Sequence, residues 1–107
     1  MAGTAVAYLG CYADNTTTRA LPNRIAFADR AISVERCQAL AAQGKYSVFA
    51  LQGTSCFAGS SLSAAQVYGR WADAACSLTC LGNRLQRCGF ANSTVTLSSL
   101  YQLQYGY

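Results

Sequence analysis

The sequence contains no histidine among its 107 residues. Histidine is the side chain that most often acts as a general acid or base near neutral pH. A cysteine nucleophile in this chain would therefore have no histidine to deprotonate it. This absence argues against a cysteine-dependent enzyme.

Acidic residues are also scarce, since the chain has only Asp14, Asp29, Glu35 and Asp73. A glycosidase needs two carboxylates that face each other across a cleft. Three of the four have structural roles of their own: Asp14 begins a turn, Glu35 favours a helix dipole, and Asp73 caps a turn before a cysteine. The sequence also has no glycine-rich phosphate loop, nucleophile elbow or acidic metal-binding loop. We therefore expect a protein that is not an enzyme and carries no cofactor.

Charge is sparse and evenly scattered. Only 11% of the residues are charged, and the eight basic residues, seven of them arginines, give a net charge of +4. They form no basic stripe, so nucleic acid is not an expected partner. No apolar run reaches the ~20 residues of a membrane span. Residues 1–4 lack the basic start and apolar run of a signal peptide, so we expect a removed signal or a module of a larger protein.

Cysteine, in contrast, is abundant, with six residues in 107. An even number of cysteines in a small domain indicates disulfides and an oxidising compartment, which favours an extracellular location. Fifteen pairings are formally possible. A zinc site is the rival interpretation, because Cys76, Cys80 and Cys88 offer three thiolates. No Cys-x2-Cys pair is present, however, and structural zinc takes four closely spaced ligands.

The residue pattern predicts one clear helix over residues 34–43. Ser33 is a suitable N-cap, and Gly44 occupies the position of a left-handed C-cap. Val34, Cys37, Leu40 and Ala41 recur at helical spacing and define the buried face.

Four strands are expected around this helix, at residues 6–12, 46–51, from 56 to 58 and at 94–107. Gly10 marks a bulge in the first strand. Residues 13–31 and 59–75 are expected to be irregular. The prediction is an α+β fold, with one main helix packed on a small twisted antiparallel sheet and stapled by disulfides.

Twelve aromatic residues, seven of them tyrosine, supply the candidate binding surface. Aromatic rings stack on the apolar C–H faces of sugars, while nearby polar groups bond to the hydroxyls. Tyr8, Phe49, Phe57 and Tyr101 lie on expected strands and are assigned to the core. The candidate exposed platform comprises Trp71, Tyr68, Tyr12 and Tyr46, with polar contacts from Arg70, Asn83 and Asp73. A buried Trp71 is the competing interpretation.

Two sequons for N-glycosylation are present, Asn15-Thr16-Thr17 and Asn92-Ser93-Thr94. In a eukaryotic secretory pathway we expect at least one of them to carry a glycan. Short sequons also arise by chance, so the sequence leaves this open.

The cysteines recur with characteristic neighbours. The most specific segment is Cys76-x3-Cys80-x-Gly82-Asn83-x4-Cys88-Gly89, preceded by Gly10-Cys11-Tyr12, Ser33-Val34-Glu35-Arg36-Cys37 and Gly53 with Cys56. This arrangement resembles the WSC domain, a cysteine-rich module of fungal cell-wall stress sensors and of other extracellular proteins. The resemblance covers about residues 8–103 of one domain that spans residues 1–107. It implies a fold like the PAN/apple domain, and it implies a structural polar contact between Asp14 and Arg19.

The family usually has eight cysteines, and this chain has Ala41 and Ala58 where the other two stand. The absence of both cysteines is consistent with the loss of one whole disulfide, because a single cysteine left without its partner would be a reactive thiol. The family pairing, carried over residue by residue, implies Cys11–Cys76, Cys37–Cys56 and Cys80–Cys88.

Two functions follow from the resemblance and the aromatic residues. The first is an extracellular module that binds cell-wall or matrix polysaccharide. The second is a structural module that associates with itself, with an exposed edge strand near Tyr105 adding to a neighbour's sheet. The first is preferred on family-level analogy alone.

Overall fold

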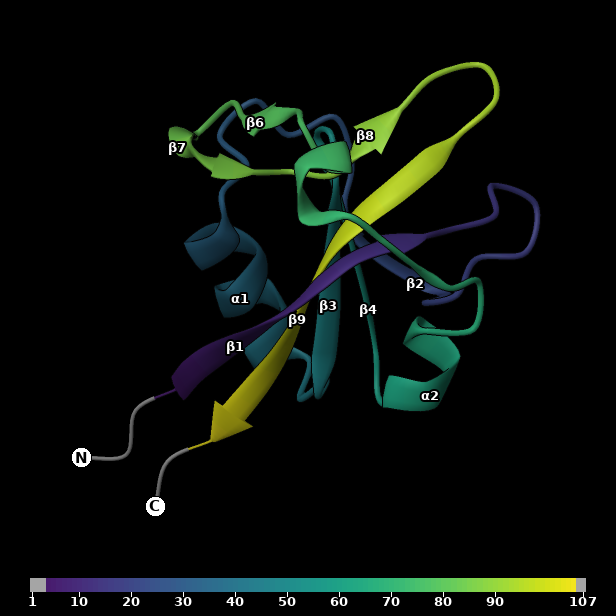
Figure 1. The fold of residues 1–107 in the computed structure, drawn as a ribbon. Helices are drawn as coiled ribbons and strands as arrows, with labels where there is room; N and C mark the ends of the chain where they lie inside the picture. Colours follow the sequence, from purple (N-terminus) through teal and green to yellow (C-terminus); the bar gives the residue numbers. More distant parts are fainter. Residues whose placement is uncertain (1–3, 106–107) are drawn as a thin grey trace.

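The computed structural model describes residues 4–105, which form one main helix and a sheet that dominates the fold (Figure 1). This is the α+β class that the sequence predicts. The elements, in chain order, are β1 (Thr4–Ala13), β2 (Asn23–Ala26), α1 (Val34–Gln43), β3 (Val48–Gln52), β4 (Ser55–Gly59), α2 (Leu62–Ala65), β5 (Arg70–Trp71), the 3-10 turn η1 (Asp73–Ala75), β6 (Thr79–Cys80), β7 (Asn83–Arg87), β8 (Phe90–Ala91) and β9 (Thr96–Tyr105). No helix in this part of the chain has the length and apolar character of a membrane span.

Helix α1 has the predicted bounds. The Ser33 side chain accepts a 3.1 Å hydrogen bond from the Arg36 N–H, which satisfies one free donor of the first turn. The predicted left-handed C-cap is wrong: Gly44 has φ −83°, and the left-handed residue is Lys45, with φ +61°. A Cβ at position 44 would lie 2.5 Å from Cε2 of Tyr46, so a larger residue there requires the Tyr46 ring to move.

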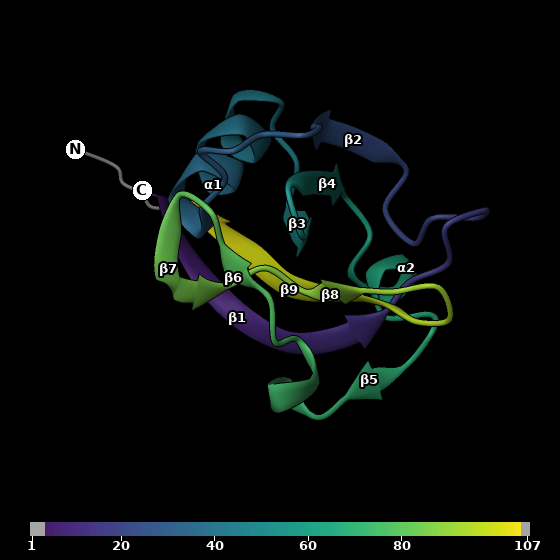
Figure 2. The ribbon, with the colours of Figure 1, turned by 90° about the horizontal axis from the view of Figure 1, so that it is seen from above.

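The main sheet is antiparallel throughout, in the order β2-β4-β3-β9-β1-β5, with β8 pairing the start of β9. Strands β1 and β9 are its long, twisted centre (Figure 2). The predicted bulge in β1 is confirmed, since the register shifts between Tyr8 and Gly10 and Gly10 has φ +134°. The predicted closing strand ends in the structure at Tyr105; its last two residues lie outside the described part.

Four short elements occur where irregular chain was predicted. Strand β2 has four residues, α2 four, β5 two and η1 three. Each is too short to show a period of its own, and pairing with β4 or β1 forms the two strands. Tertiary contacts, which outweigh local propensity, explain these errors.

The core lies on both faces of the sheet. One cluster joins α1 to the sheet through Cys37, Phe49 and Leu51, and the other packs Leu21 and α2 against Val48, Ala50 and Phe57. The predicted burial of Phe49 and Phe57 is confirmed. Tyr12 also belongs to the second cluster and is buried, so its predicted exposure is wrong.

Three disulfides link the described residues, and all six sulfurs are buried. They join Cys11 to Cys76, Cys37 to Cys56 and Cys80 to Cys88, which is the pairing that the resemblance implies. Ala41 and Ala58 are fully buried in the same cluster as Cys37 and Cys56. They therefore fill the place expected for a fourth bridge.

The turn after β1 is built around Asp14. Its carboxylate accepts hydrogen bonds from the N–H groups of Asn15 and Ala20 and forms a 3.1 Å ion pair with Arg19. The Asp14 side chain is 5% exposed, and Gln52 also donates to it. The expected structural contact between Asp14 and Arg19 is confirmed.

Candidate functional site

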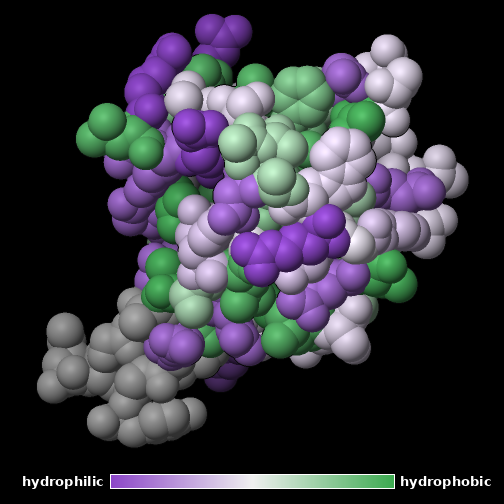
Figure 3. Space-filling model, viewed as in Figure 1, coloured by the Kyte–Doolittle hydropathy of each residue, from purple (hydrophilic) through white to green (hydrophobic). Residues whose placement is uncertain are grey.

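The candidate site is an open groove of about 520 Å³ on the face of the sheet that carries α1. Strands β1 and β9 form its floor, η1 one wall and β7 the other. We call it the tyrosine groove; its lining residues are Tyr8, Asp73, Ala74, Leu85, Gln86, Arg87 and Tyr101. Polar and apolar side chains are mixed over the face of the molecule in Figure 3, with no single apolar patch.

A row of aromatic rings crosses the sheet and ends in this groove. Tyr101 of β9 is the direct cross-strand partner of both Phe49 of β3 and Tyr8 of β1. The ring centroids are 5.3 Å apart in each pair, stacked for Phe49 and tilted for Tyr8. Phe49 is fully buried, whereas Tyr8 is 46% exposed. The row therefore anchors a partly exposed ring to the core.

The position of Tyr8 on a strand predicts a place in the core, and that prediction is wrong. Helix α1 makes its main strand contacts with β3 and β2, which lie away from β1 in the strand order, and Tyr8 on β1 is left 46% exposed. Strand β5 pairs with β1 only at Cys11 and Tyr12. At Tyr8 the strand is therefore an edge of the sheet, where one flank of the ring meets solvent.

Asp73 and Arg70 place charged groups at the rim of the groove. The Tyr8 hydroxyl donates a 2.9 Å hydrogen bond to Oδ1 of Asp73, and a guanidinium nitrogen of Arg70 lies 3.5 Å from the same oxygen. Partial burial, the Asp73 hydrogen bond and the Asp73 charge together raise the pKa of Tyr8 to about 12. Burial, followed by the charge of Glu35, also raises the pKa of Tyr101.

The bulge at Gly10 makes room for Arg70. A Cβ at Gly10 would lie 2.8 Å from Nε of Arg70, so the guanidinium crosses the strand where a side chain is missing. Only glycine readily adopts the φ of +134° found there. The bulge thus positions a cation beside Tyr8, in agreement with the way bulges redirect side chains near functional sites.

Gln86 fixes the β7 wall to helix α1. Its Oε1 accepts a 2.8 Å hydrogen bond from the Val34 N–H, and its Nε2 donates to the Glu35 carboxylate at 2.7 Å. This bond is the main cause of the lowered pKa of Glu35. Gly82 lets the hairpin approach closely, because a Cβ there would lie 2.2 Å from the Ala31 carbonyl oxygen.

Two disulfides hold the two walls. Cys11–Cys76 ties the end of η1 to β1, and Cys80–Cys88 closes the hairpin that carries Leu85, Gln86 and Arg87. Both disulfides therefore fix the positions of the two groove walls. Leu85, at 95% exposure, stands at the open side of the β7 wall.

Trp71, Tyr68 and Arg70 are exposed, as the sequence predicts for platform residues. Trp71 lies on β5, between Arg70 and Asp73 in sequence, and is 45% exposed. The Tyr68 hydroxyl donates to the Thr18 carbonyl at 2.7 Å, which ties two loops together. Of these three, Arg70 contacts the groove residue Asp73, and Trp71 follows Arg70 on β5 and pairs with Cys11 of β1.

Tyr12, Tyr46 and Asn83 do not belong to the groove. The buried Tyr12 accepts a 3.0 Å hydrogen bond from Gln66. Tyr46 packs half-buried against the cluster under α1. Oδ1 of Asn83 accepts from the Leu85 N–H at 3.0 Å and shapes the hairpin turn. The seven residues that the sequence predicts for the platform and its polar contacts therefore do not form one surface.

Sequence reasoning missed Tyr8, Tyr101 and Gln86. Both tyrosines alternate with their neighbours as core residues do, and only the strand order shows that one of them faces an edge. Nothing in the sequence indicates that Gln86 contacts the helix N-terminus, because the two are 51 residues or more apart.

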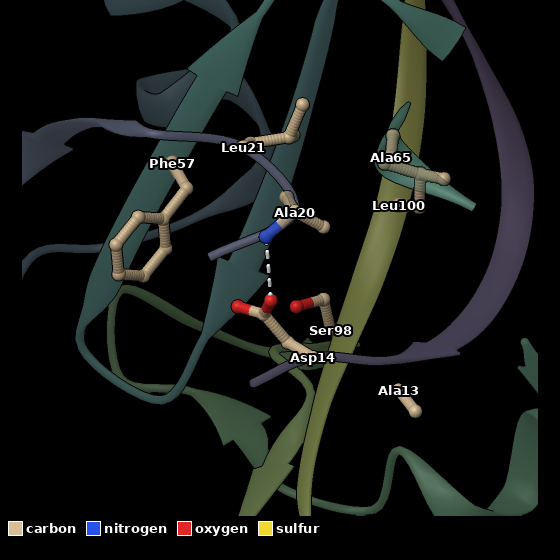
Figure 4. A pocket seen from close by; sticks show the side chains of 9 residues that line it. Ala13, Asp14, Ala20, Leu21, Phe57, Ala65, Ser98 and Leu100 are labelled. Atoms are coloured by element: carbon tan, nitrogen blue, oxygen red, sulfur yellow. Dashed lines mark hydrogen bonds between the residues drawn. The ribbon is translucent and has the colours of Figure 1, made fainter. Parts of the chain in front are cut away.

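The four acids are all engaged in structural contacts. Asp14 and Asp29 form ion pairs with Arg19 and Arg36. Glu35 accepts a hydrogen bond from Gln86, and Asp73 accepts one from Tyr8. Within residues 4–105 there is no group of three His, Cys, Asp or Glu residues suited to a metal ion. The cavity beside Asp14 (Figure 4) has about 10 Å³, room for about one water and too small for a sugar.

A sequence profile of the WSC domain family matches residues 8–90 of this chain. The match includes all six cysteines and every lining residue of the tyrosine groove except Tyr101.

Proposed function

The chain belongs to the WSC domain family, and on that premise we propose that it is a non-catalytic extracellular module that binds cell-wall or matrix polysaccharide in the tyrosine groove. The observation that carries the proposal is the half-exposed ring of Tyr8, held by the aromatic row and bordered by charged groups. The disulfides support the extracellular location, because such bonds persist in oxidising compartments.

The chemistry of the groove matches that of a sugar ring. The faces of Tyr8 and Leu85 offer apolar surface for the C–H face of a pyranose. Asp73 accepts hydrogen bonds from hydroxyls, and Arg70 and Arg87 donate to them. The volume of about 520 Å³ lies within the range of small-molecule sites, and the open shape allows a polymer to pass through.

Trp71 is proposed as a second stacking surface beside the groove. It neighbours Arg70 along the chain and pairs with Cys11 across the strands, three residues after Tyr8. A polysaccharide that stacks on Tyr8 would meet Trp71 as it continues along β1.

The test compares binding to insoluble β-glucan, chitin and xylan. We expect the wild-type chain to sediment with at least one of them, and Tyr8→Ala and Trp71→Ala to lose most of that binding while retaining the fold by circular dichroism. Phe27→Ala is the matched control, because Phe27 is a 68% exposed aromatic outside the groove. Absence of binding by the wild type to all three polymers, or equal binding by all variants, overturns the proposal.

Self-association is the second candidate function. The sequence places the pairing edge near Tyr105. Among the described residues β9 pairs with β1 as far as Thr4 and Tyr105, whereas its pairing with β3 ends at Val48 and Gln102, so the β3 side of β9 has no strand partner at Tyr105. Strand β1 before Cys11 is a second open edge, and a second copy could add to the sheet at either one. Light scattering over a concentration series tests it, and a chain that stays monomeric throughout contradicts it.

We also propose that the arrangement is a sheet-rich variant of the PAN/apple fold. The support is its single main helix on one face of a twisted antiparallel sheet.

A further inference from the structure

Both N-glycosylation sequons lie at one end of the molecule. Asn15 follows β1, and Asn92 lies in the turn between β8 and β9. Figures 1 and 2 show the two loops side by side, at the end away from the chain termini. The Asp14 N–H bonds to the Thr96 carbonyl at 2.9 Å, and residues of both loops line one hollow of about 240 Å³.

In both sequons the side-chain nitrogen Nδ2, the atom to which a glycan is attached, faces away from the backbone. Oδ1 of Asn15 accepts hydrogen bonds from the N–H groups of Thr17 and Thr18, at 2.8 and 3.0 Å. Oδ1 of Asn92 accepts from the Thr94 and Val95 N–H groups, at 2.8 and 2.7 Å, and from the Thr94 hydroxyl at 3.0 Å. A backbone N–H can only donate, so the oxygen must face the backbone and Nδ2 must face away from it.

The two asparagines outside sequons are placed differently. Nδ2 of Asn23 donates to the Ala58 carbonyl of β4, and Asn83, whose Oδ1 also accepts from a turn N–H, is half-buried in the β7 hairpin. Asn15 and Asn92 are both exposed, and the side-chain hydrogen bonds that hold their turns use Oδ1. A group added to Nδ2 therefore breaks none of the bonds that hold either turn.

We propose that Asn15 and Asn92 both carry N-linked oligosaccharides, which form a glycan cluster at the β8–β9 end of the sheet. The donor class is an oligosaccharide linked to a lipid pyrophosphate, supplied by a eukaryotic secretory pathway. Nδ2 forms a bond to the anomeric carbon and loses one proton. The bond from the anomeric carbon to the pyrophosphate oxygen breaks, and the lipid pyrophosphate leaves with the bonding electrons.

The cluster is compatible with an open tyrosine groove. Residue 14 lies six strand residues beyond Tyr8, or about 20 Å at the rise of a β-strand. Thr4 and Tyr105, which pair with each other, mark the opposite end of β1 and β9. The glycans would cover the hollow between the two loops and leave the groove and the chain ends uncovered.

The test is secretion of the full chain from a eukaryotic host, with intact mass measured before and after treatment with peptide N-glycosidase. We expect two oligosaccharides on the wild type and one on each of Asn15→Asp and Asn92→Asp. Aspartate keeps an acceptor oxygen for the turn but has no Nδ2, so folding should be retained. Thr18→Ala and Ser93→Ala are matched controls outside the required sequon positions, and both should keep two.

Peptide mapping of the deglycosylated chain adds an independent readout, because the enzyme converts each glycosylated asparagine to aspartate. Wild type with one oligosaccharide or none overturns the proposal. Polysaccharide binding by the double aspartate variant should equal that of the wild type. Failure of glycosylation therefore leaves the proposed binding function intact, and failure of binding leaves the glycan cluster intact.

Discussion

Tyr8 and Asp73 are 65 residues apart in sequence, yet the Tyr8 hydroxyl donates a 2.9 Å hydrogen bond to Oδ1 of Asp73. The Cys11–Cys76 disulfide brings the two segments together, three residues from each partner. The bond holds a partly exposed ring and a carboxylate in one place at the rim of the tyrosine groove. It gives the proposed site a fixed shape before any ligand arrives.

This bond should be visible in a pH titration. Tyr8 is expected to ionise near pH 12, whereas an ordinary tyrosine ionises near pH 10. Because the folded pKa is raised, the stabilisation is complete below pH 10 and is lost as the pH rises from about 10 to 12. Asp73→Asn should lower the pKa of Tyr8 only part of the way, because burial is the largest cause. Tyrosinate absorbance checks this, with Tyr8→Phe to identify the signal; a Tyr8 that ionises with the exposed tyrosines contradicts it.

Gly89 and Gly53 form a matched pair for testing how closely the backbone at Gly89 packs against Leu97 of β9 and Leu51 of β3. Both are left-handed, with φ of +69° and +59°. A Cβ at Gly89 would lie 2.3 Å from the Leu97 carbonyl oxygen, whereas a Cβ at Gly53 meets nothing within 4 Å. Gly53→Ala should cost about 1–2 kcal/mol for its φ alone, and Gly89→Ala about 3 kcal/mol or more. Denaturant unfolding measures both, and equal losses would show that the clash is relieved by backbone movement.

Asp14 and Asp29 give a second matched pair, because each forms an ion pair with an arginine. The Asp14 side chain is 5% exposed and accepts from four donors, while Asp29 pairs with the half-exposed Arg36. Asp14→Asn loses the charge and one acceptor oxygen, and should cost about 2–3 kcal/mol. Asp29→Asn should cost clearly less, because solvent screens its pair. A larger loss for Asp29→Asn in urea unfolding would contradict this ranking.

Ala41 and Ala58 predict where a fourth disulfide can form. Ala41 is one helical turn beyond Cys37, about 6 Å along α1, and Ala58 is two residues beyond Cys56, about 6.6 Å along β4. The equal spacing places the two alanines opposite each other as a second rung. Mass spectrometry of Ala41→Cys with Ala58→Cys should find a bridge between the new cysteines and no free thiol. Two free thiols, or a bridge to Cys37 or Cys56, would disprove the placement.

The sequence predicts the helix well because its signals are local. Ser33 caps the first turn, and the apolar positions recur at helical spacing up to the glycine at position 44. The signal for the last strand is equally local, because Tyr101 and Leu103 alternate with Gln102 and Gln104, and Leu103 is buried as that alternation requires. Strands β2 and β5 have no such pattern, and only their partners make them strands.

The groove shows where sequence reasoning ends. The exposure of Trp71 and Tyr68 is predictable because aromatic residues in a polar loop tend to remain in solvent. For Tyr12 and Tyr8 the sequence predicts the opposite of the observed exposure. Tyr12, beside a turn, is buried in the cluster that contains α2, and Tyr8, within a strand, is exposed at an edge. Which strand is an edge depends on pairings across the whole chain, and no local pattern encodes that order.

The most direct test of the central claim is to record heteronuclear NMR spectra of the 107-residue chain during titration with soluble fragments of the polysaccharide that it sediments with. The account predicts saturable shifts that cluster at Tyr8, Asp73, Gln86, Arg87 and Tyr101 and spare Phe27. Saturable shifts that centre on Phe27, with the signals of the tyrosine groove unchanged, would contradict it.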